Sequence, residues 1–241
     1  MKIEGRNAVR EAILSNKTID KVLVRNGSKD KVANEIIDLC KSRRIKFQFV
    51  DNVTLDRESA TKAHQGVIAY VEDFKYSSVQ DILNVAKEKN EDNFILILDG
   101  IEDPHNLGSI IRVAECLGVH GIIIGKNRAC SVNETVVKVS AGATNYMKIA
   151  KVTNIHTEIE NLKKQNVWVY ACELGGEPVE KTNLKGNVAI VIGSEGFGCS
   201  KMTKDISDGV VTLQMKGKVN SLNASVATGI ILYETLLKRL S

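Results

Sequence analysis

Five short apolar runs in the second part of the chain constrain its fold most strongly. Each contains almost only aliphatic or aromatic residues, and stretches with helical spacing or glycine-rich corners separate them. Uninterrupted runs of this kind are typical of parallel strands that are buried on both faces. An α/β fold with a parallel sheet between helices is therefore predicted. The runs are residues 94–98, 121–124, 167–170, 188–192 and 210–213.

The first seventy residues show a different pattern, with shorter elements. Residues 5–14 have apolar side chains at helical spacing, and residues 29–44 read as an amphipathic helix. Short strands are expected at 22–24, 45–50 and 66–71. These elements predict a small α/β domain over residues 1–72. We expect a polar linker over 73–91, with one weak helical stretch at Val79, Ile82, Leu83 and Ala86, and a larger domain over 92–241.

The net charge of +4 is unevenly placed along the chain. Residues 1–62 carry 14 Lys and Arg against 9 Asp and Glu, whereas the rest is nearly balanced. A positive excess in one domain favours a polyanionic partner such as RNA. An ordinary solvated surface would explain the same excess.

Composition excludes several classes of function. No apolar run approaches the roughly 18 residues that would cross a bilayer, and the first residues lack the apolar segment of a secretory signal. The five cysteines are scattered without a C-x-x-C pair, so we expect reduced thiols, no metal site and a cytoplasmic protein.

Three polar, glycine-containing corners border the apolar runs, at residues 99–112, 192–198 and 215–225. In the first, Asn106 is expected to cap a helix that ends at Gly118, with Arg112 one to two turns along it. The second reads Ile-Gly-Ser-Glu-Gly-Phe-Gly and follows a strand. Because open α/β sheets bind ligands at the carboxyl edge, the corners predict one polar cleft there.

The chemistry of these corners is unusual for a hydrolase or a nucleotide-binding protein. The second corner reads G-x-x-G-x-G, which is neither the dinucleotide fingerprint nor a P-loop. The histidines have no Ser or Cys at nucleophile-elbow spacing. The available Asn, Arg, Glu and Ser groups can position a ligand and stabilise developing charge. Helix caps, a solvated arginine and a flexible turn are the plain structural alternatives.

The three corners closely resemble the three motifs of the SpoU class of RNA ribose 2′-O-methyltransferases, in the SPOUT superfamily. Residues 5–12, Gly-Arg-Asn-Ala-Val-Arg-Glu-Ala, and 64–67, His-Gln-Gly-Val, are similar to the two-domain, RlmB/TrmH-like branch. This resemblance covers nearly the whole chain. It implies an α/β-knot catalytic domain with a deep trefoil knot, the cofactor S-adenosylmethionine, and a homodimer with its active site at the subunit interface. The small domain would bind RNA.

The resemblance also implies site residues. Arg112 would stabilise the alkoxide that forms as the ribose hydroxyl attacks, although proton abstraction by a neutral arginine stays open. The other residues would hold the ribose, the phosphate or the loops. The catalytic set is Asn106, Arg112, Glu195, Ser221 and Asn223, and the cofactor set is Ile192, Gly193, Leu213, Met215, Gly217 and Leu222.

Two positions depart from the family pattern. Gln214 stands where relatives often carry proline, which implies a less rigid loop, and Ala224 replaces a commoner valine. The implied substrate is a guanosine of large-subunit (23S) ribosomal RNA. The alternatives are a tRNA ribose methyltransferase, a methylase that confers antibiotic resistance, and an RNA-binding assembly factor without activity. A metabolic enzyme with a Rossmann-like site would require the missing fingerprint.

Overall fold

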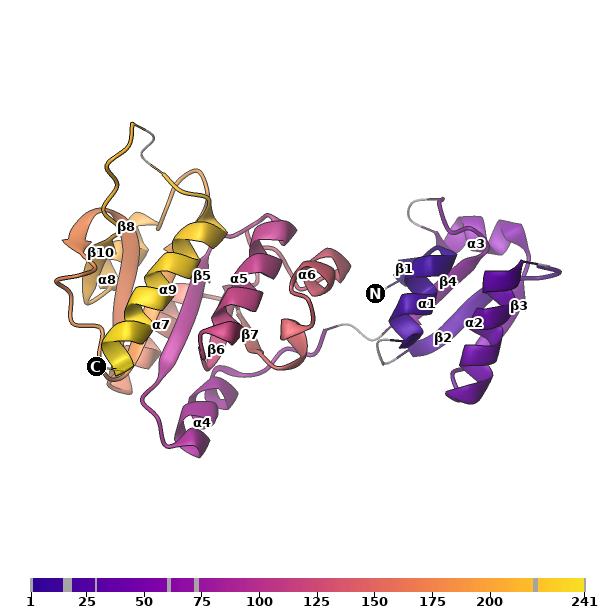
Figure 1. Cartoon of the computed structure of the whole chain (residues 1–241), viewed down its shortest axis with the longest axis horizontal. Helices are drawn as coiled ribbons and strands as arrows, with labels where there is room; N and C mark the ends of the chain where they lie inside the picture. The colour runs from indigo at the N-terminus through magenta and orange to yellow at the C-terminus, as the bar shows by residue number, and fades with distance from the viewer. Residues whose placement is uncertain are drawn as a thin grey trace. The chain divides into compact units, whose positions relative to one another are not determined.

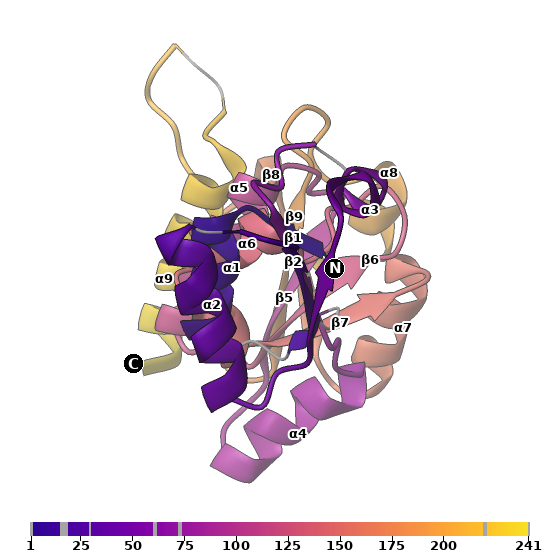
Figure 2. The same ribbon diagram turned by 90° about the vertical axis from the view of Figure 1, so that its right-hand side faces the viewer.

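The computed structural model describes residues 2–14, 19–28, 30–59, 62–71, 74–218 and 221–240. The chain forms two compact units, Met1–Lys75 and Tyr76–Ser241. Figures 1 and 2 label the elements of both where there is room. Among the described residues, no helix combines the length and the apolar character that crossing a membrane requires.

The N-terminal unit is built on a four-stranded sheet with the order β1-β4-β2-β3. Strand β4 pairs antiparallel with both β1 and β2, and β3 pairs parallel with β2. Helices α1 and α2 pack against each other on one face of this sheet (Figure 2). The elements are β1 (Lys2–Glu4), α1 (Arg6–Leu14), β2 (Ile19–Arg25), α2 (Lys31–Ser42), β3 (Phe47–Val50), α3 (Asn52–Glu58) and β4 (Val67–Val71).

Alternation along β2 divides this unit into two small cores. Val22 and Val24 point towards α1 and α2 and pack with Ile36. Leu23 points to the opposite face, where it meets Leu55 of α3. Successive residues of a strand face opposite sides of its sheet, so a run of three apolar residues can supply both cores.

The C-terminal unit contains the parallel sheet that the apolar runs predict. Its six strands have the order β10-β8-β9-β5-β6-β7, and all pairs are parallel. The carboxyl ends of β5 and β9 are level, because Asp99 lies opposite Gly193. The strands are β5 (Phe94–Asp99), β6 (Gly121–Gly125), β7 (Lys148–Val152), β8 (Trp168–Pro178), β9 (Val188–Gly193) and β10 (Gly209–Thr212).

Helices cover both faces of this sheet. Helices α5 and α9 lie side by side across β5 on one face (Figure 1), whereas α4, α7 and α8 contribute to the core on the other. Buried isoleucines of β5 and β6, such as Ile95 and Ile123, fill the space beneath them. The helices are α4 (Val79–Lys89), α5 (Pro104–Cys116), α6 (Glu134–Val139), α7 (Ile155–Lys164), α8 (Lys201–Ile206) and α9 (Ala224–Leu240), with a short 3₁₀ turn at Ala143–Asn145.

The segment 73–91, expected to be a linker, holds α4, which belongs to the C-terminal unit. Ser78 and Asp81 form a capping box that begins this helix. Its Ile82 packs over Gly121, where an added Cβ would lie 2.4 Å from the Ile82 side chain. A specific fit to a glycine in a distant strand thus fixes a helix that looks weak and polar in sequence. Residues 72 and 73, at the expected boundary, lie outside the described residues.

The helix of the first corner begins earlier than the sequence suggests. Asp103 is its N-cap, with a side chain that accepts from the backbone N–H of His105, and Pro104 occupies the first turn. Asn106 is therefore inside the helix rather than at its cap. Gly118, with φ +74°, follows the last turn as expected. Relieved of capping, the Asn106 side chain is available for another contact.

Candidate active site

A tight glycine turn lies at the carboxyl end of β9. The backbone N–H of Ser194 donates to Gly198 O at 3.1 Å, and that of Gly198 donates to Ser194 O at 2.9 Å. A Cβ on Gly193 would lie 2.0 Å from the carbonyl carbon of Gly198. Only a residue without a side chain fits there, so the second corner is a closed loop with a required glycine.

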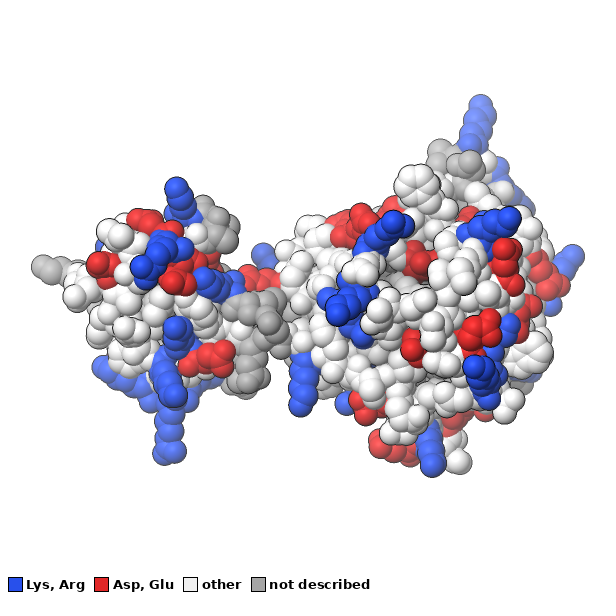
Figure 3. Space-filling view, turned by 180° about the vertical axis from the view of Figure 1, so that it is seen from behind, with Lys and Arg blue, Asp and Glu red and all other residues white. Residues whose placement is uncertain are grey.

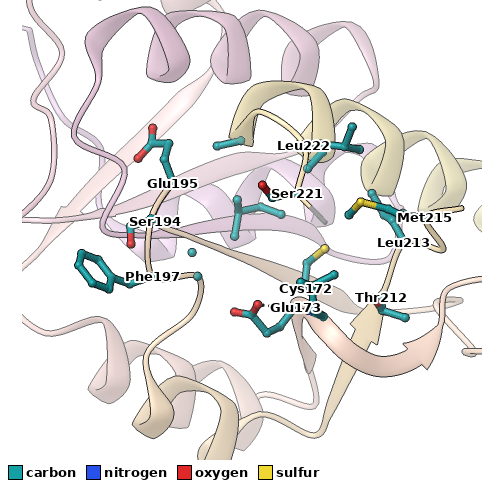
Figure 4. A pocket seen from close by; sticks show the side chains of 17 residues that line it. Cys172, Glu173, Ser194, Glu195, Phe197, Thr212, Leu213, Met215, Ser221 and Leu222 are labelled. Carbon is teal, nitrogen blue, oxygen red and sulfur yellow. Dashed lines mark hydrogen bonds between the residues drawn. The ribbon is translucent and has the colours of Figure 1, made fainter. Parts of the chain in front are cut away.

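A cavity of about 340 Å³ opens beside this turn. Its walls come from the glycine turn, the outer part of β8, the segment after β10 and the start of α9 (Figure 4). A volume of this size suits a small organic ligand, since ligand pockets start at roughly 300 Å³. Figure 4 shows Leu213, Met215 and Leu222 as an apolar wall across from Glu173 and Glu195.

A chain of side-chain hydrogen bonds joins the three corners. The Asn106 amide nitrogen donates to Glu195 Oε1 at 2.7 Å, and the Asn223 amide nitrogen donates to Asn106 Oδ1 at 2.9 Å. Asn106 is only 8% exposed. Asn223 Oδ1 also accepts from the backbone N–H groups of Ser225 and Val226, which caps α9. Residues 117 positions apart in sequence are thereby fixed within one polar junction.

The structure places most of the expected site residues around this cavity. Asn106 and Asn223 connect to it through Glu195, and Gly217 lines an adjoining hollow. Arg112 is exposed on α5 and is not part of the cavity wall. Seven of the eleven expected residues line the cavity: Ile192, Gly193, Glu195, Leu213, Met215, Ser221 and Leu222.

Two acidic residues outside the expected set also accept hydrogen bonds beside the cavity. Glu173 follows the point where β8 leaves β9, and its Oε2 accepts from the backbone N–H of Cys199 at 2.8 Å. Asp99 Oδ2 accepts from Thr203 Oγ1 at 2.6 Å, which fixes α8 behind the glycine turn. The position of Asp99, directly after an apolar run, is a sequence signal that could have indicated it. Glu173 had no such signal, because β8 continues beyond its apolar part.

The two thiols beside the cavity are held in their neutral form. Burial first, and the Glu173 carboxylate second, raise the pKa of Cys172 to about 11. The same causes, burial being the larger, raise the pKa of Cys199 still further. Neither cysteine therefore provides a thiolate nucleophile at neutral pH. Within the described ranges, no cluster of three or more His, Cys, Asp and Glu could hold a metal ion.

Comparison with known proteins gives the family. Residues 93–233 match the model of the SpoU rRNA methylase family, and residues 2–77 match that of the RNA 2′-O ribose methyltransferase substrate-binding domain. The chain belongs to the SpoU methylase family. The Bacillus subtilis protein YacO, assigned to the TrmH family of tRNA/rRNA methyltransferases, is 41% identical over 98% of this chain and 94% of its own.

Other proteins that are similar to this SpoU-family chain support the same assignment. A TrmH-family tRNA/rRNA methyltransferase of Staphylococcus aureus is 42% identical over 98% of this chain and 96% of its own. Among solved structures, the SpoU methyltransferase AviRb of Streptomyces viridochromogenes, in complex with AdoMet, superposes with a TM-score of 0.70. That match covers 100% of this chain and 90% of AviRb at 22% identity, and it supports the two-unit α/β fold.

Proposed function

We propose that this protein transfers a methyl group from S-adenosylmethionine to a ribose 2′-oxygen of RNA, and that its substrate is a guanosine of large-subunit ribosomal RNA. The observation that carries the proposal is the junction of Asn106, Glu195 and Asn223, in which hydrogen bonds join one residue of each motif beside the cavity that Glu195 lines. Membership of the SpoU family supports the reaction class.

The cavity suits the cofactor in shape and chemistry. Gly193 and the closed Ser194–Gly198 turn that it permits form a backbone wall along one side of the cavity. Leu213, Met215 and Leu222 offer an apolar wall for a flat ring. These residues, with Ile192 and Gly217, would hold S-adenosylmethionine, which supplies a methyl group activated on a sulfonium centre.

The polar residues would act on the ribose. A ribose hydroxyl is a weak nucleophile and must lose its proton as the new bond forms. Arginine stays protonated in proteins, so Arg112 would stabilise the emerging alkoxide by its charge. Asn106, Glu195 and Asn223 would fix the geometry of loops and ribose, and Ser221, at the cavity wall, would contact the substrate.

A homodimer accords with the outer face of α9. The apolar stripe of this helix, whose members recur at intervals of three or four residues, faces outwards, because they are about half exposed. Helix α5, which carries Arg112, packs beside α9. We infer that a second copy covers this face and brings Arg112 near a substrate, and that the loops of the cavity form a trefoil knot. The stripe consists of Val226, Ile230, Tyr233 and Leu237.

The N-terminal unit would hold the RNA. Lys21, Arg44 and Lys46 are exposed where β2 and β3 begin and α2 ends, and the described residues place none of them in an ion pair. Figure 3 shows Lys and Arg side chains gathered over one end of this unit. Unpaired cations of this kind bind phosphates without reading sequence.

Neutralising part of this basic end should weaken RNA binding. In the double variant Arg44→Gln/Lys46→Gln we expect RNA affinity to fall about tenfold at moderate salt. The salt dependence of log K should become shallower by roughly 1 to 2, since fewer phosphates are neutralised. Lys87→Gln/Lys89→Gln on α4 removes the same charge elsewhere and serves as the control. Equal losses in both double variants, measured by filter binding, would point to net charge rather than to this surface.

Mapping ribose methylation in total RNA, with and without the gene, tests the proposed function. One 2′-O-methyl mark missing from 23S ribosomal RNA is expected. A mark missing from a tRNA would keep the reaction and correct the substrate. An unchanged pattern, together with no methyl transfer by the purified protein, would contradict the proposal.

A further inference from the structure

The cavity wall is acidic. Among the described residues that line it, Glu173 and Glu195 are the charged side chains, and the wall contains no Lys, Arg or His. Lys216 lines the adjoining hollow and not this cavity. A cavity with two carboxylates and no cation favours a ligand with positive charge.

The two carboxylates are placed differently. Glu195 is exposed, and its Oε1 accepts from the Asn106 amide. Glu173 is half-buried at the floor of the cavity, where Figure 4 shows its carboxylate beside Cys172 and below the glycine turn. Because water screens a half-buried charge less, Glu173 has the stronger influence on a bound ligand.

Glu173 is also built into the turn itself. Its Oε2 accepts from the backbone N–H of Cys199, and a Cβ on Gly198 would lie 1.9 Å from that oxygen. Gly198 has φ +65°, which also favours glycine. Within the part of the chain that the structure describes, no ion pair neutralises Glu173. Two backbone donors hold its carboxylate, because Oε1 also accepts from the N–H of Leu174 at 3.2 Å, and its charge remains available to a ligand.

The charge of the cofactor changes during methyl transfer. The ribose oxygen forms a bond to the methyl carbon, the carbon–sulfur bond breaks with its electron pair going to sulfur, and the hydroxyl proton leaves to solvent. S-adenosylmethionine carries a sulfonium, an ammonium and a carboxylate, so its net charge is about +1. The product S-adenosylhomocysteine has a neutral sulfur and a net charge of about zero at neutral pH.

We propose that Glu173 is a specificity residue that makes the cavity prefer the cationic methyl donor to its neutral product. The proposal rests on the proposed function, because it takes S-adenosylmethionine as the ligand. A carboxylate at the cavity floor stabilises the donor before transfer and loses that interaction when the sulfur becomes neutral. The residue would thus favour exchange of product for fresh donor. Its charge binds the ground state, so removing it should not slow the chemical step.

Replacing Glu173 with glutamine isolates the charge from the structural contact. The amide oxygen of glutamine can still accept from the N–H of Cys199, which keeps the contact with the turn, whereas the local hydrogen bond from the N–H of Leu174 is lost with the charge. For Glu173→Gln we expect calorimetry to show about tenfold weaker binding of S-adenosylmethionine, about 1.4 kcal/mol. The affinity for S-adenosylhomocysteine should change less than about twofold. In turnover, KM for the donor should rise and kcat should not fall.

Two further variants make the result interpretable. Glu177→Gln removes a charge from the same strand outside the cavity wall, and should change neither affinity. Glu173→Asp keeps the charge and should keep the wild-type ratio of the two affinities, even if the shorter side chain lowers the melting temperature. This variant decides the question should Glu173→Gln fail to fold.

The outcomes separate this inference from the function on which it rests. A wild-type protein that binds neither ligand contradicts the proposed function, and the inference with it. A wild-type protein that binds both, with a donor-to-product ratio unchanged in Glu173→Gln, refutes the role of Glu173 alone. An equal loss of both affinities in Glu173→Gln would also refute it. Such a loss would indicate a distorted turn, which weakens the binding of the charged donor and the neutral product alike.

Discussion

Replacing Arg112 with alanine is expected to reduce single-turnover methylation about 10²- to 10³-fold, the usual loss when one donor to a developing oxyanion is removed. The dissociation constant of S-adenosylmethionine should stay within about twofold. Arg112 is exposed and does not line the cavity, so its loss disturbs neither the cofactor wall nor the core. Quenched-flow assays with saturating cofactor and RNA, alongside calorimetry, measure the two quantities.

Two other substitutions sharpen this test of Arg112. Arg112→Lys keeps the charge but not the planar fork of donors, so an intermediate rate is expected. Lys164→Ala removes an exposed cation from α7, beside the other face of the sheet, and should leave the rate unchanged. Wild-type turnover by Arg112→Ala would remove Arg112 from the mechanism. A parallel loss of cofactor affinity would instead assign it to binding.

Local sequence patterns were sufficient to predict the sheet and the meeting of the three corners. Each of the five apolar runs falls on a strand of the parallel sheet. Four of these strands lie inside the sheet, where burial on both faces leaves a clear signature, and the fifth, β10, lies at one edge. The edge strand β7 was missed, since its sequence Lys-Ile-Ala-Lys-Val carries two lysines at a partly solvated edge. β1, with only three residues, is equally short of signal.

The missed features depend on contacts between distant residues. The weak helical stretch in the expected linker is α4, but its membership of the C-terminal unit depends on contacts such as that of Ile82 with Gly121. Asn106 looks like a cap because Asp103, the actual cap, is separated from the apolar stripe by Pro104. The apolar stripe of α9 faces outwards, and the buried side of the helix carries Thr228 and Thr235, whose hydroxyls donate to the carbonyl oxygens of the preceding turn. Spacing predicts a stripe but does not say which partner covers it.

Replacing Gly193 with alanine is expected to abolish measurable cofactor binding and to destabilise the C-terminal unit. The new Cβ would lie 2.0 Å from the carbonyl carbon of Gly198 and 2.1 Å from the backbone nitrogen of Cys199. Both are backbone atoms, so no side chain can rotate away, and the paired hydrogen bonds of Ser194 and Gly198 must break. Overpacking of this kind costs about 1–3 kcal/mol or more, which lowers Tm by roughly 3–10 °C in a domain of this size.

Gly196→Ala provides a control within the same turn, because a Cβ there meets nothing within 4 Å. Its Tm should stay within about 2 °C of wild type, as measured by calorimetry. This contrast is expected of a closed turn, in which position 193 has no room for a Cβ and position 196 does. A flexible glycine loop would instead tolerate alanine at both positions. Normal cofactor affinity and Tm in Gly193→Ala would therefore show that the turn opens freely. The cavity would then be shaped by the ligand rather than prepared for it by the backbone of this chain.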